Sequence, residues 1–199
     1  MKKIKISLRK NWSTIFLVVI FLILLISPDA KAWMMRQVLS TGLLNSKIER
    51  RSENKSPENN SASVPNFSVV DAKGKITDVS GLKGKVVFIN FWASWCPPCR
   101  AEFPSIQKFY NQYKGNENLI FLTVNLDDET GKGKEYLLKE NLSIPFLVPA
   151  GDIPKEYFGG SLPTTVVLDK SGAIRMHHAG MADYSKDSFH QQINALLNE

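Results

Sequence analysis

The feature that most constrains this chain is a strand-like run that leads, after three residues, to a pair of cysteines. Six of the seven residues in Val86–Trp92 (VVFINFW) are β-branched or aromatic, which is typical of a strand buried on both faces. Cys96 and Cys99 follow, and the residues beyond them have helical periodicity. A fold with this order places two sulfur atoms where a buried strand gives way to a helix.

These are the only two cysteines in the 199-residue chain, and their close spacing favours redox chemistry. An inert disulfide here would close a very short loop and so remove little entropy from the unfolded chain. A structural zinc site needs four ligands, and the remaining candidates are His177, His178, His190 and scattered carboxylates. A peroxiredoxin would carry Thr or Ser at the position of Ala93 and Pro at that of Ile89. We therefore predict reversible thiol–disulfide exchange without a metal or a cofactor.

The start of a helix favours a cysteine that has to ionise. Unpaired N–H groups and the helix macrodipole stabilise a thiolate there, so the thiol pKa of Cys96 is expected to fall to about 7 or lower. Pro98 fits the first helical turn because its φ is fixed at a helical value, and Pro97 precedes it. Cys96 is predicted to attack a partner's disulfide, and Cys99 to resolve the mixed disulfide. Trp95 is expected to shield the sulfurs or to present an apolar docking surface.

Residues 1–32 have the organisation of a signal anchor or a signal peptide. Basic residues precede the apolar run Ile15–Ile26, and no charge occurs between Lys10 and Asp29. A helix of that length would span roughly 27 Å, near the thickness of a bilayer's hydrocarbon core. The basic end should stay in the cytoplasm, which places the catalytic part outside it. Residues 30–32 (AKA) have the form of a cleavage site, so a retained anchor and a cleaved, secreted form both stay open.

Two further segments separate this leader from the folded domain. Residues 33–48 are predicted to be an amphipathic membrane-proximal segment, because apolar side chains recur there at helical spacing. These apolar side chains are Met34, Met35, Val38, Leu39 and Leu43. Residues 49–63 are polar apart from Ala62, so we expect a flexible linker. The folded domain is predicted to occupy residues 64–199.

The distribution of charge excludes a nucleic-acid-binding domain. The formal net charge is +6, but residues 1–55 hold 11 of the 25 basic residues and 3 of the 19 acidic ones. Residues 56–199 therefore carry 14 basic against 16 acidic residues, a net charge of −2. A protein that binds nucleic acid needs its basic surface on the folded domain, where it can neutralise phosphates.

The domain is predicted to alternate between strands and helices. In chain order, the predicted elements are strands at 67–70, 75–79 and 86–92, a helix ending at Gly115, a strand at 119–125, a helix at 134–141, strands at 164–168 and 173–178, and a helix at 185–197. This order predicts an α/β sandwich in which helices flank a mixed central sheet, with an N-terminal β-hairpin extension.

The stretch from Gly84 to Pro104 (GKVVFINFWASWCPPCRAEFP) resembles the thioredoxin superfamily, in particular its membrane-tethered TlpA/ResA-type branch. The resemblance continues through residues 161–165 (SLPTT) and covers about 64–199. It implies a thioredoxin-like sandwich with a cis peptide bond between Leu162 and Pro163, packed beside the cysteines. There the backbone of Leu162 would pair with an incoming peptide. The alternative is an ordinary trans proline at the start of a strand.

One position departs from the pattern of the cytoplasmic thioredoxins, which carry a buried Asp in the central strand. This chain has Asn90 there, and the nearest acid in sequence is Glu102, three residues after Cys99. The resemblance to ResA-type proteins implies that Glu102 lies near the cysteines and tunes their titration. A carboxylate there would raise the pKa of a thiol, and it would also be placed to relay a proton. The alternative is a solvated glutamate in the first turns of the helix.

Two other polar groups are expected to have no role in the chemistry. Asp127-Asp128-Glu129 follows a predicted strand and lacks the ligand spacing of a cation-binding loop, so we expect a solvated turn. His177 and His178 are adjacent on a predicted strand and should therefore point to opposite faces.

The expected function is reduction of disulfides in exported proteins, with apocytochrome c as one client class that the TlpA/ResA resemblance suggests. A reductant outside the cytoplasm needs electrons from across the membrane, so a transmembrane thiol reductase is the expected donor. Two alternatives stay open. One is an oxidant or isomerase with the same fold, and the other is a non-enzymatic tethered module that binds clients.

Overall fold

Strand β3 (Val86–Trp92) runs through the centre of the domain, and all of its residues are buried, as their apolar sequence predicts. The structure is a computed structural model that describes residues 12–40 and 65–199. β3 pairs in parallel with β4 (Leu119–Asn125) on one side and antiparallel with β6 (Thr164–Leu168) on the other. The predicted mixed sheet is therefore confirmed.

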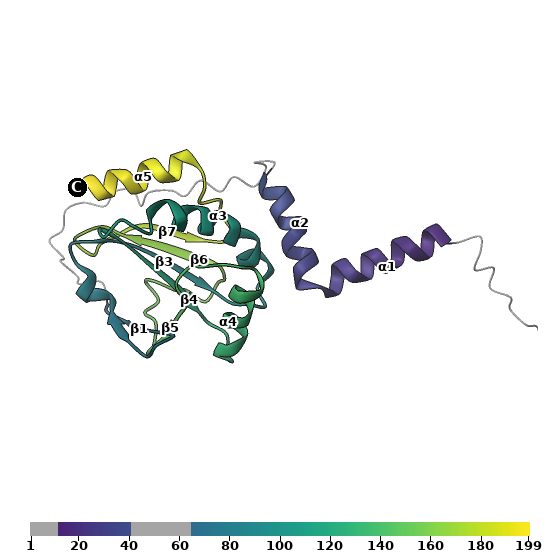
Figure 1. Ribbon diagram of the computed structural model, residues 1–199, viewed down its shortest axis with the longest axis horizontal. Helices are drawn as coiled ribbons and strands as arrows, with labels where there is room; N and C mark the ends of the chain where they lie inside the picture. The colour runs from purple at the N-terminus through teal and green to yellow at the C-terminus, as the bar shows by residue number, and fades with distance from the viewer. Residues whose placement is uncertain (1–11, 41–64) are drawn as a thin grey trace, which may run out of the picture.

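The sheet widens on both sides of these central strands (Figure 1). β7 (Ile174–Ala179) pairs antiparallel with β6. On the other side, β5 (Leu147–Pro149) joins β4 to the antiparallel pair of β1 (Ser68–Asp71) and β2 (Ile76–Asp78), which the short 3-10 helix η1 (Val79–Leu82) follows. In the part of the chain that the structure describes, the strand order is β2-β1-β5-β4-β3-β6-β7. The sequence does not predict β5, because three residues are too few to show a strand's periodicity.

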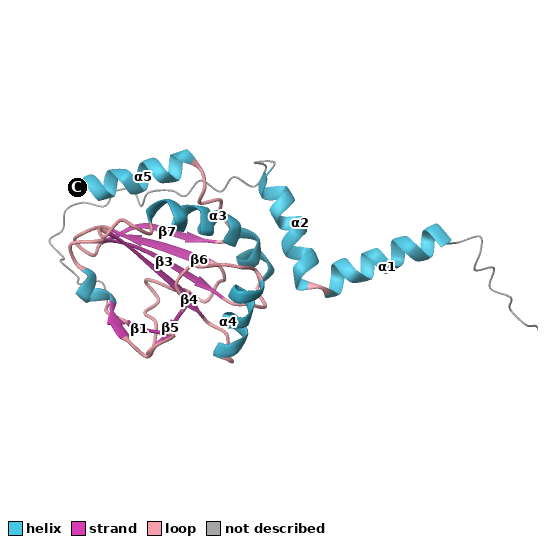
Figure 2. Ribbon diagram, viewed as in Figure 1, coloured by secondary structure: helices cyan, strands magenta, loops and turns pink. Residues whose placement is uncertain are grey.

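Helices α3 (Pro97–Tyr113) and α5 (Asp187–Asn198) lie together on one face of the sheet (Figure 2). Aromatic rings fill the space between these helices and β3: the ring of Phe88 lies 5.2 Å from that of Phe109 and 5.4 Å from that of Tyr184. Because both faces of β3 are packed, the turn that follows it has a fixed position. The opposite face is covered by a second cluster, which includes Phe67, Val69, Phe91, Leu122, Val124, Tyr157 and Val166.

Helix α4 (Thr130–Lys139) begins earlier than the predicted helix at 134–141. Two glycines, Gly131 and Gly133, weaken the helical signal of its first turns. Gly133 has a packing role, because a Cβ atom at this position would lie 2.6 Å from Nδ2 of Asn125. The side chain of Asn125, at the end of β4, therefore occupies the space that a side chain at Gly133 would need.

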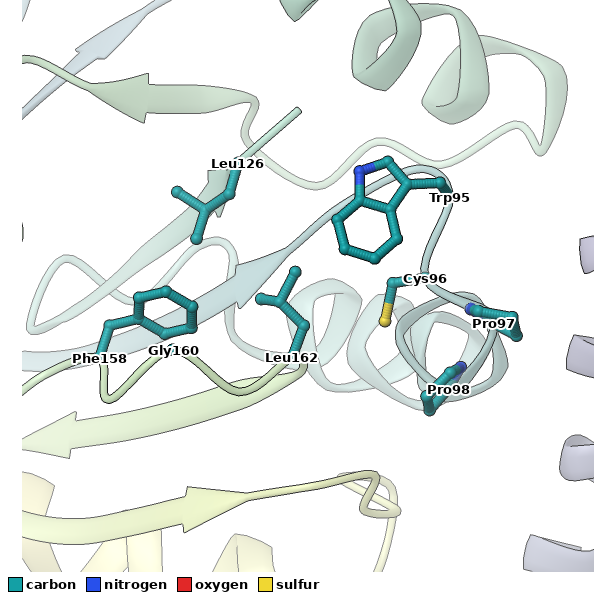
Figure 3. A pocket seen from close by; sticks show the side chains of 8 residues that line it. All are labelled: Trp95, Cys96, Pro97, Pro98, Leu126, Phe158, Gly160 and Leu162. Atoms are coloured by element: carbon teal, nitrogen blue, oxygen red, sulfur yellow. The ribbon is translucent and has the colours of Figure 1, made fainter. Parts of the chain in front are cut away.

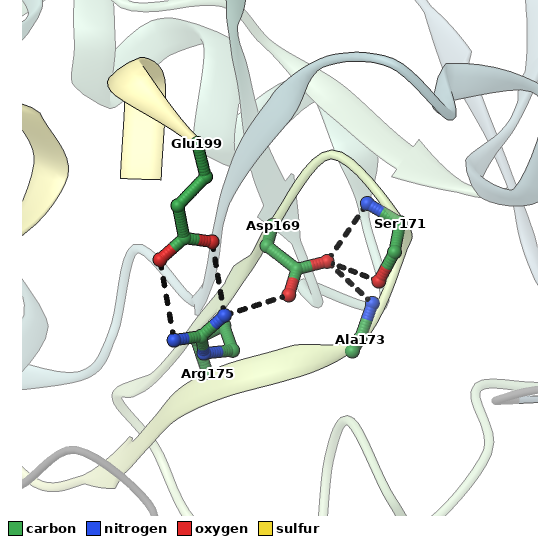
Figure 4. Close-up of polar contacts among 5 residues, drawn as sticks. All are labelled: Asp169, Ser171, Ala173, Arg175 and Glu199. Carbon is green, nitrogen blue, oxygen red and sulfur yellow. Dashed lines mark hydrogen bonds and ion pairs between the residues drawn. The ribbon is translucent and has the colours of Figure 1, made fainter. Parts of the chain in front are cut away.

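The turn between β6 and β7 is linked to the last residue of the chain (Figure 4). Oδ1 of Asp169 accepts hydrogen bonds from the N–H groups of Ser171 and Ala173, at 2.8 and 3.0 Å. Its Oδ2 pairs with Arg175 at 3.1 Å, and Arg175 also pairs with Glu199 at 3.0 Å. Partial burial acts to raise the pKa of Asp169, but the hydrogen bonds from Ser171, Arg175 and Ala173 hold it below its ordinary value. The ionised form of Asp169 thus stabilises the turn.

Two helices precede the domain, α1 (Trp12–Ile26) and α2 (Pro28–Ser40), and α2 packs against α3 while α1 projects away from the domain (Figure 1). Among the described residues, neither helix alone has both the length and the apolar composition of a membrane span. Taken as a pair they pass that criterion, with a bend of 91° between them. The predicted linker at 49–63 and residues 41–48 of the membrane-proximal segment lie outside the described residues.

Candidate active site

Cys96 and Cys99 form a disulfide at the start of α3, with their Cα atoms 5.3 Å apart. Cys96 is the N-cap of the helix, and Pro97 and Pro98 occupy its first two positions. The backbone N–H of Cys99 donates a hydrogen bond of 3.2 Å to Sγ of Cys96. Because this N–H belongs to the first turn, it has no partner within the helix, and it can stabilise negative charge on the Cys96 sulfur once the disulfide is reduced.

An apolar groove of about 440 Å³ opens beside Cys96 (Figure 3). Its lining residues are Trp95, Cys96, Pro97, Pro98, Leu126, Phe158, Gly160 and Leu162. We call this the active-site groove. The side chain of Trp95 borders it and is 61% exposed, whereas Cys99 is completely buried and Cys96 is 3% exposed. The peptide bond between Leu162 and Pro163 is cis, as the resemblance implies. The groove therefore leaves an open apolar surface beside the Cys96 side of the disulfide.

Glu102 is completely buried on the sheet side of α3. Nδ2 of Asn90 donates a hydrogen bond of 2.8 Å to its Oε1, and the N–H of Ala182 donates one of 3.3 Å to its Oε2. Burial raises the pKa of Glu102 to about 8, although these two hydrogen bonds act to lower it. The carboxyl group is thus mainly protonated at neutral pH. The alternative of a solvated helix glutamate is wrong, because β3 and the loop before α5 cover this face of α3.

The buried polar network extends from Asn90 to Thr165 in β6 and to Tyr184 in the loop before α5. Nδ2 of Asn90 also donates to Oγ1 of Thr165 at 3.0 Å, and the Tyr184 hydroxyl donates to the same oxygen at 2.6 Å. Burial, and secondly the charge on Glu102, raise the pKa of Tyr184 well above its ordinary value. Glu102 therefore titrates in a closed environment in which its neighbours stay neutral. The sequence gives no signal for the roles of Thr165 and Tyr184, which depend on contacts between distant segments.

Asp127 fixes the loop that carries Trp95 and Cys96. Its two carboxylate oxygens lie 2.9 and 3.2 Å from the N–H of Ser94, and Nδ2 of Asn125 donates to Oδ2 at 3.0 Å. The expectation of a solvated turn is therefore wrong for Asp127, which is buried, although Asp128 and Glu129 are exposed. Parallel strands end at the same edge of a sheet, so a residue just after β4 lies beside the loop that follows β3. That relationship is the signal by which Asp127 could have been found.

The structure separates the predicted site residues into two groups. The first group lines the active-site groove with Cys96 and consists of Trp95, Pro97, Pro98 and Leu162. The second group, Asn90 and Glu102, meets between β3 and α3. Leu126 and Phe158 also line the groove, and sequence reasoning missed them. His177 is exposed and His178 is half-buried, in line with their expected opposite orientation. Among the described residues, no group of three or more His, Cys, Asp or Glu side chains is arranged to hold a metal ion.

Comparison with solved structures places this architecture among thioredoxin-like proteins. A Chlorobium tepidum protein assigned as thiol:disulfide interchange protein DsbE is 32% identical, with a TM-score of 0.58 over 67% of this chain and 94% of the other. StoA from Bacillus subtilis is 25% identical, with a TM-score of 0.54 over 68% of this chain and 97% of its own. The predicted thioredoxin-like fold is therefore confirmed.

Curated relatives match the same region. The thiol-disulfide oxidoreductase ResA of a Bacillus cereus strain is 35% identical over 112 residues, which are 56% of this chain and 64% of that protein. The chain thus spans slightly less than two thirds of this relative's length. The ResA protein of Halalkalibacterium halodurans is 31% identical over 130 residues, covering 64% of this chain and 73% of its own. The family model for redoxin matches residues 58–193. Because that match spans well over half of the chain, we conclude that the chain belongs to the redoxin family.

Proposed function

We propose that this protein is a thiol–disulfide oxidoreductase that works outside the cytoplasm and reduces disulfides in exported proteins. The observation that carries the proposal is the position of Cys96 at the N-terminus of α3, bonded to Cys99 and facing an apolar groove. A purely structural disulfide would not need a groove or an open helix terminus beside its sulfur. The ResA relatives, which are thiol-disulfide oxidoreductases, support this interpretation.

In the proposed cycle, the Cys96 thiolate attacks one sulfur of a client disulfide. The client's S–S bond breaks, its second sulfur leaves as a thiolate, and a mixed disulfide with Cys96 forms. The Cys99 thiolate then attacks the Cys96 sulfur, which restores the Cys96–Cys99 disulfide and releases the remaining client sulfur. The client gains two electrons and two protons, and the protein loses them. A donor dithiol reverses the exchange and resets the pair.

The groove is proposed to hold the client during this exchange. Its apolar walls, with Trp95 on one side and Phe158 and Leu162 on the other, suit a client segment that is unfolded and exposes apolar side chains. The backbone of Leu162, next to the cis bond, is proposed to pair with that segment. Glu102 lies one turn beyond Cys99 on the same helix, where side chains are roughly 5–6 Å apart at Cβ, and is proposed to exchange a proton with that thiol.

The N-terminal part is proposed to tether the domain to a membrane. Residues 1–32 would act as a signal anchor or a signal peptide, 33–48 as a membrane-proximal segment, 49–63 as a linker and 64–199 as the catalytic domain. The apolar side chains of α1 are exposed along the helix, which supports insertion into lipid. With the basic residues before α1 in the cytoplasm, the domain lies outside it. We further propose that the β1–β2 pair is an N-terminal extension of the core fold.

The proposed partners are disulfide-containing exported proteins, apocytochrome c among them, and a transmembrane thiol reductase as electron donor. The same fold also supports an oxidant or isomerase. The reduction potential separates these roles, because thioredoxin-like reductants lie near about −270 mV and strong oxidants near about −120 mV. We therefore expect equilibration of the purified protein with graded glutathione or dithiothreitol buffers to give a low potential. A value near that of the oxidants would assign the protein the opposite direction of electron flow.

A further inference from the structure

The side chain of Arg100, immediately after the redox pair, is enclosed between the domain and helix α2. Arg100 is 7% exposed, and its guanidinium group lies over the ring of Tyr136 at 4.5 Å from the ring centroid. The carboxylate that pairs with it is that of Asp29, in the first turn of α2, and Asp29 also lies 3.6 Å from Lys139 at the end of α4. An enclosed cation is stable when a counter-charge accompanies it. The catalytic helix thus takes its counter-charge from outside residues 64–199.

Two further contacts hold α2 against the domain, and we call the region of contact between α2, α3 and α4 the seat of α2. Nη2 of Arg36 donates a hydrogen bond of 2.8 Å to the carbonyl oxygen of Arg100. Ala32, one turn earlier, is 2% exposed, and its small side chain lets the two helices approach closely. Asp29, Ala32 and Arg36 recur at helical spacing and lie on one face of α2. We call this face the domain face.

Outside the domain face, α2 exposes three apolar side chains: Met34 and Val38 lie one turn apart, and Trp33 lies between them and the domain face. α1 also exposes apolar side chains, and the axes of the two helices are bent by 91°. If α1 follows the membrane normal, α2 lies parallel to the bilayer surface. Tryptophan is enriched at the boundary between lipid tails and headgroups, so Trp33 is placed where an interfacial anchor is expected. We call this face the lipid face.

We propose that α2 is a two-sided bracket, whose domain face holds α3 and α4 while its lipid face lies in the interfacial layer of the bilayer. This inference rests on the proposed membrane tether and deepens it. A tether that is free along its whole length would let the active site rotate and move away from the membrane. The bracket instead holds Cys96, at the start of α3, at a fixed height and orientation relative to the membrane in which the electron donor resides. It also requires residues 28–40 to remain attached, since cleavage after Ala32 would remove Asp29.

The test uses the full chain bound to vesicles of phosphatidylcholine and phosphatidylglycerol. Ala32→Glu introduces a larger charged side chain into the domain face, and Met34→Glu introduces the same side chain into the lipid face two residues away. Hydrogen exchange of the backbone amides in residues 30–39 and 134–139 reports the seat. Energy transfer from a dye fused after Glu199 to a headgroup dye reports the distance of the domain from the membrane.

For the wild type we expect slow hydrogen exchange in residues 30–39 and 134–139. The distance between the C-terminal dye and the headgroup dye should have a single narrow distribution. Ala32→Glu should speed exchange by about tenfold or more and broaden the distance distribution, while the protein still floats with the vesicles through α1. Met34→Glu should leave exchange in residues 134–139 unchanged and lower energy transfer. Asp29→Asn, a milder change, should shift the same signals as Ala32→Glu to a smaller degree.

If wild type and Ala32→Glu float equally with the vesicles and give the same hydrogen exchange and the same dye distance, the bracket is wrong and the membrane tether stands. If the wild type does not float, both proposals fail.

Discussion

The side-chain amide of Asn90, in the central strand, donates a hydrogen bond of 2.8 Å to the carboxyl group of Glu102, in the helix that carries the two cysteines. Cytoplasmic thioredoxins have an acid in the strand, and this chain has its buried acid in the helix. Burial raises the pKa of Glu102 to about 8, so the group changes its charge just above neutral pH. The stability of the protein and the titration of its thiols should therefore both depend on the charge of Glu102.

The stability of the protein should fall as the pH rises through the pKa of Glu102. The pKa is raised from 4.5 to about 8 in the folded state, so the folded protein binds more protons than the unfolded chain between these values. The stabilisation is therefore fully present below pH 4.5 and is lost as the pH rises to about 8. The upper limit of the loss is roughly 5 kcal/mol. Urea unfolding of wild type and Glu102→Gln between pH 5 and 9 measures it, and Gln should flatten the dependence. Parallel curves for the two proteins would contradict this assignment.

Thiolate formation should be coupled to Glu102 only above neutral pH. Below pH 7 the neutral carboxyl group does not repel a thiolate, so the ultraviolet thiolate titrations of reduced wild type and Glu102→Gln should coincide there. Once Glu102 ionises, its negative charge should suppress further thiolate formation and broaden the wild-type curve. Glu102→Gln should titrate without this broadening. A difference confined to pH values below 7 would mean that the carboxyl group is ionised at neutral pH.

Replacing Asp127 should weaken the loop before Cys96. Asp127→Ala removes the acceptor of the Ser94 N–H, and we expect a loss of about 1–3 kcal/mol in the free energy of unfolding. The rate of insulin reduction should also fall, because this loop positions Trp95 and Cys96. Asp128→Ala is the matched control, since Asp128 is exposed, and should change stability by no more than about 0.5 kcal/mol. Equal effects of the two replacements would reduce Asp127 to a surface residue.

Replacing Gly133 should separate its packing role from its low helix propensity. A Cβ atom at Gly133 would lie 2.6 Å from the Asn125 side chain, so Gly133→Ala should destabilise the domain by about 1–3 kcal/mol. At Gly131, in the same turn of α4, a Cβ atom would meet nothing within 4 Å, and Gly131→Ala should instead stabilise by about 0.5–1 kcal/mol. Thermal unfolding of both variants measures the difference in sign. Stabilisation by both would mean that Asn125 moves away without cost.

The roles of the two cysteines should differ in a trapping experiment. Cys99→Ser should leave Cys96 able to attack and unable to be released, so mixed disulfides with client proteins should accumulate on non-reducing gels. Cys96→Ser should abolish them. Retention of full disulfide reductase activity by Cys96→Ser would assign attack to the other sulfur. Capture of clients by a variant lacking both cysteines would favour the binding-module alternative.

The local sequence predicted the central unit of the fold, because β3, the cysteine pair and α3 are consecutive and each has its own signal. It also predicted the last helix and the β6–β7 hairpin, because each has its own local signal. It did not predict that Asp127 is buried or that Phe158 reaches the groove, since both depend on how distant segments meet. The environment of Glu102 was beyond sequence reasoning too, because Ala182, which donates to it, is 80 residues away in the chain. Resemblance, rather than residue pattern, supplied the cis bond before Pro163.

The difference in exposure between the two sulfurs limits how an external thiol can reach the disulfide. With Cys99 completely buried and Cys96 at the groove, an external thiol reaches the disulfide from one direction only. Under the proposed function, the electron donor attacks Cys96 in the oxidised protein, and Cys96 attacks the client in the reduced protein, so both reactions use the same sulfur atom. Turnover must therefore alternate between the two reactions, each of which produces the redox state that the other one consumes. Electrons from the donor and electrons to the client thus pass through the Cys96 sulfur in turn.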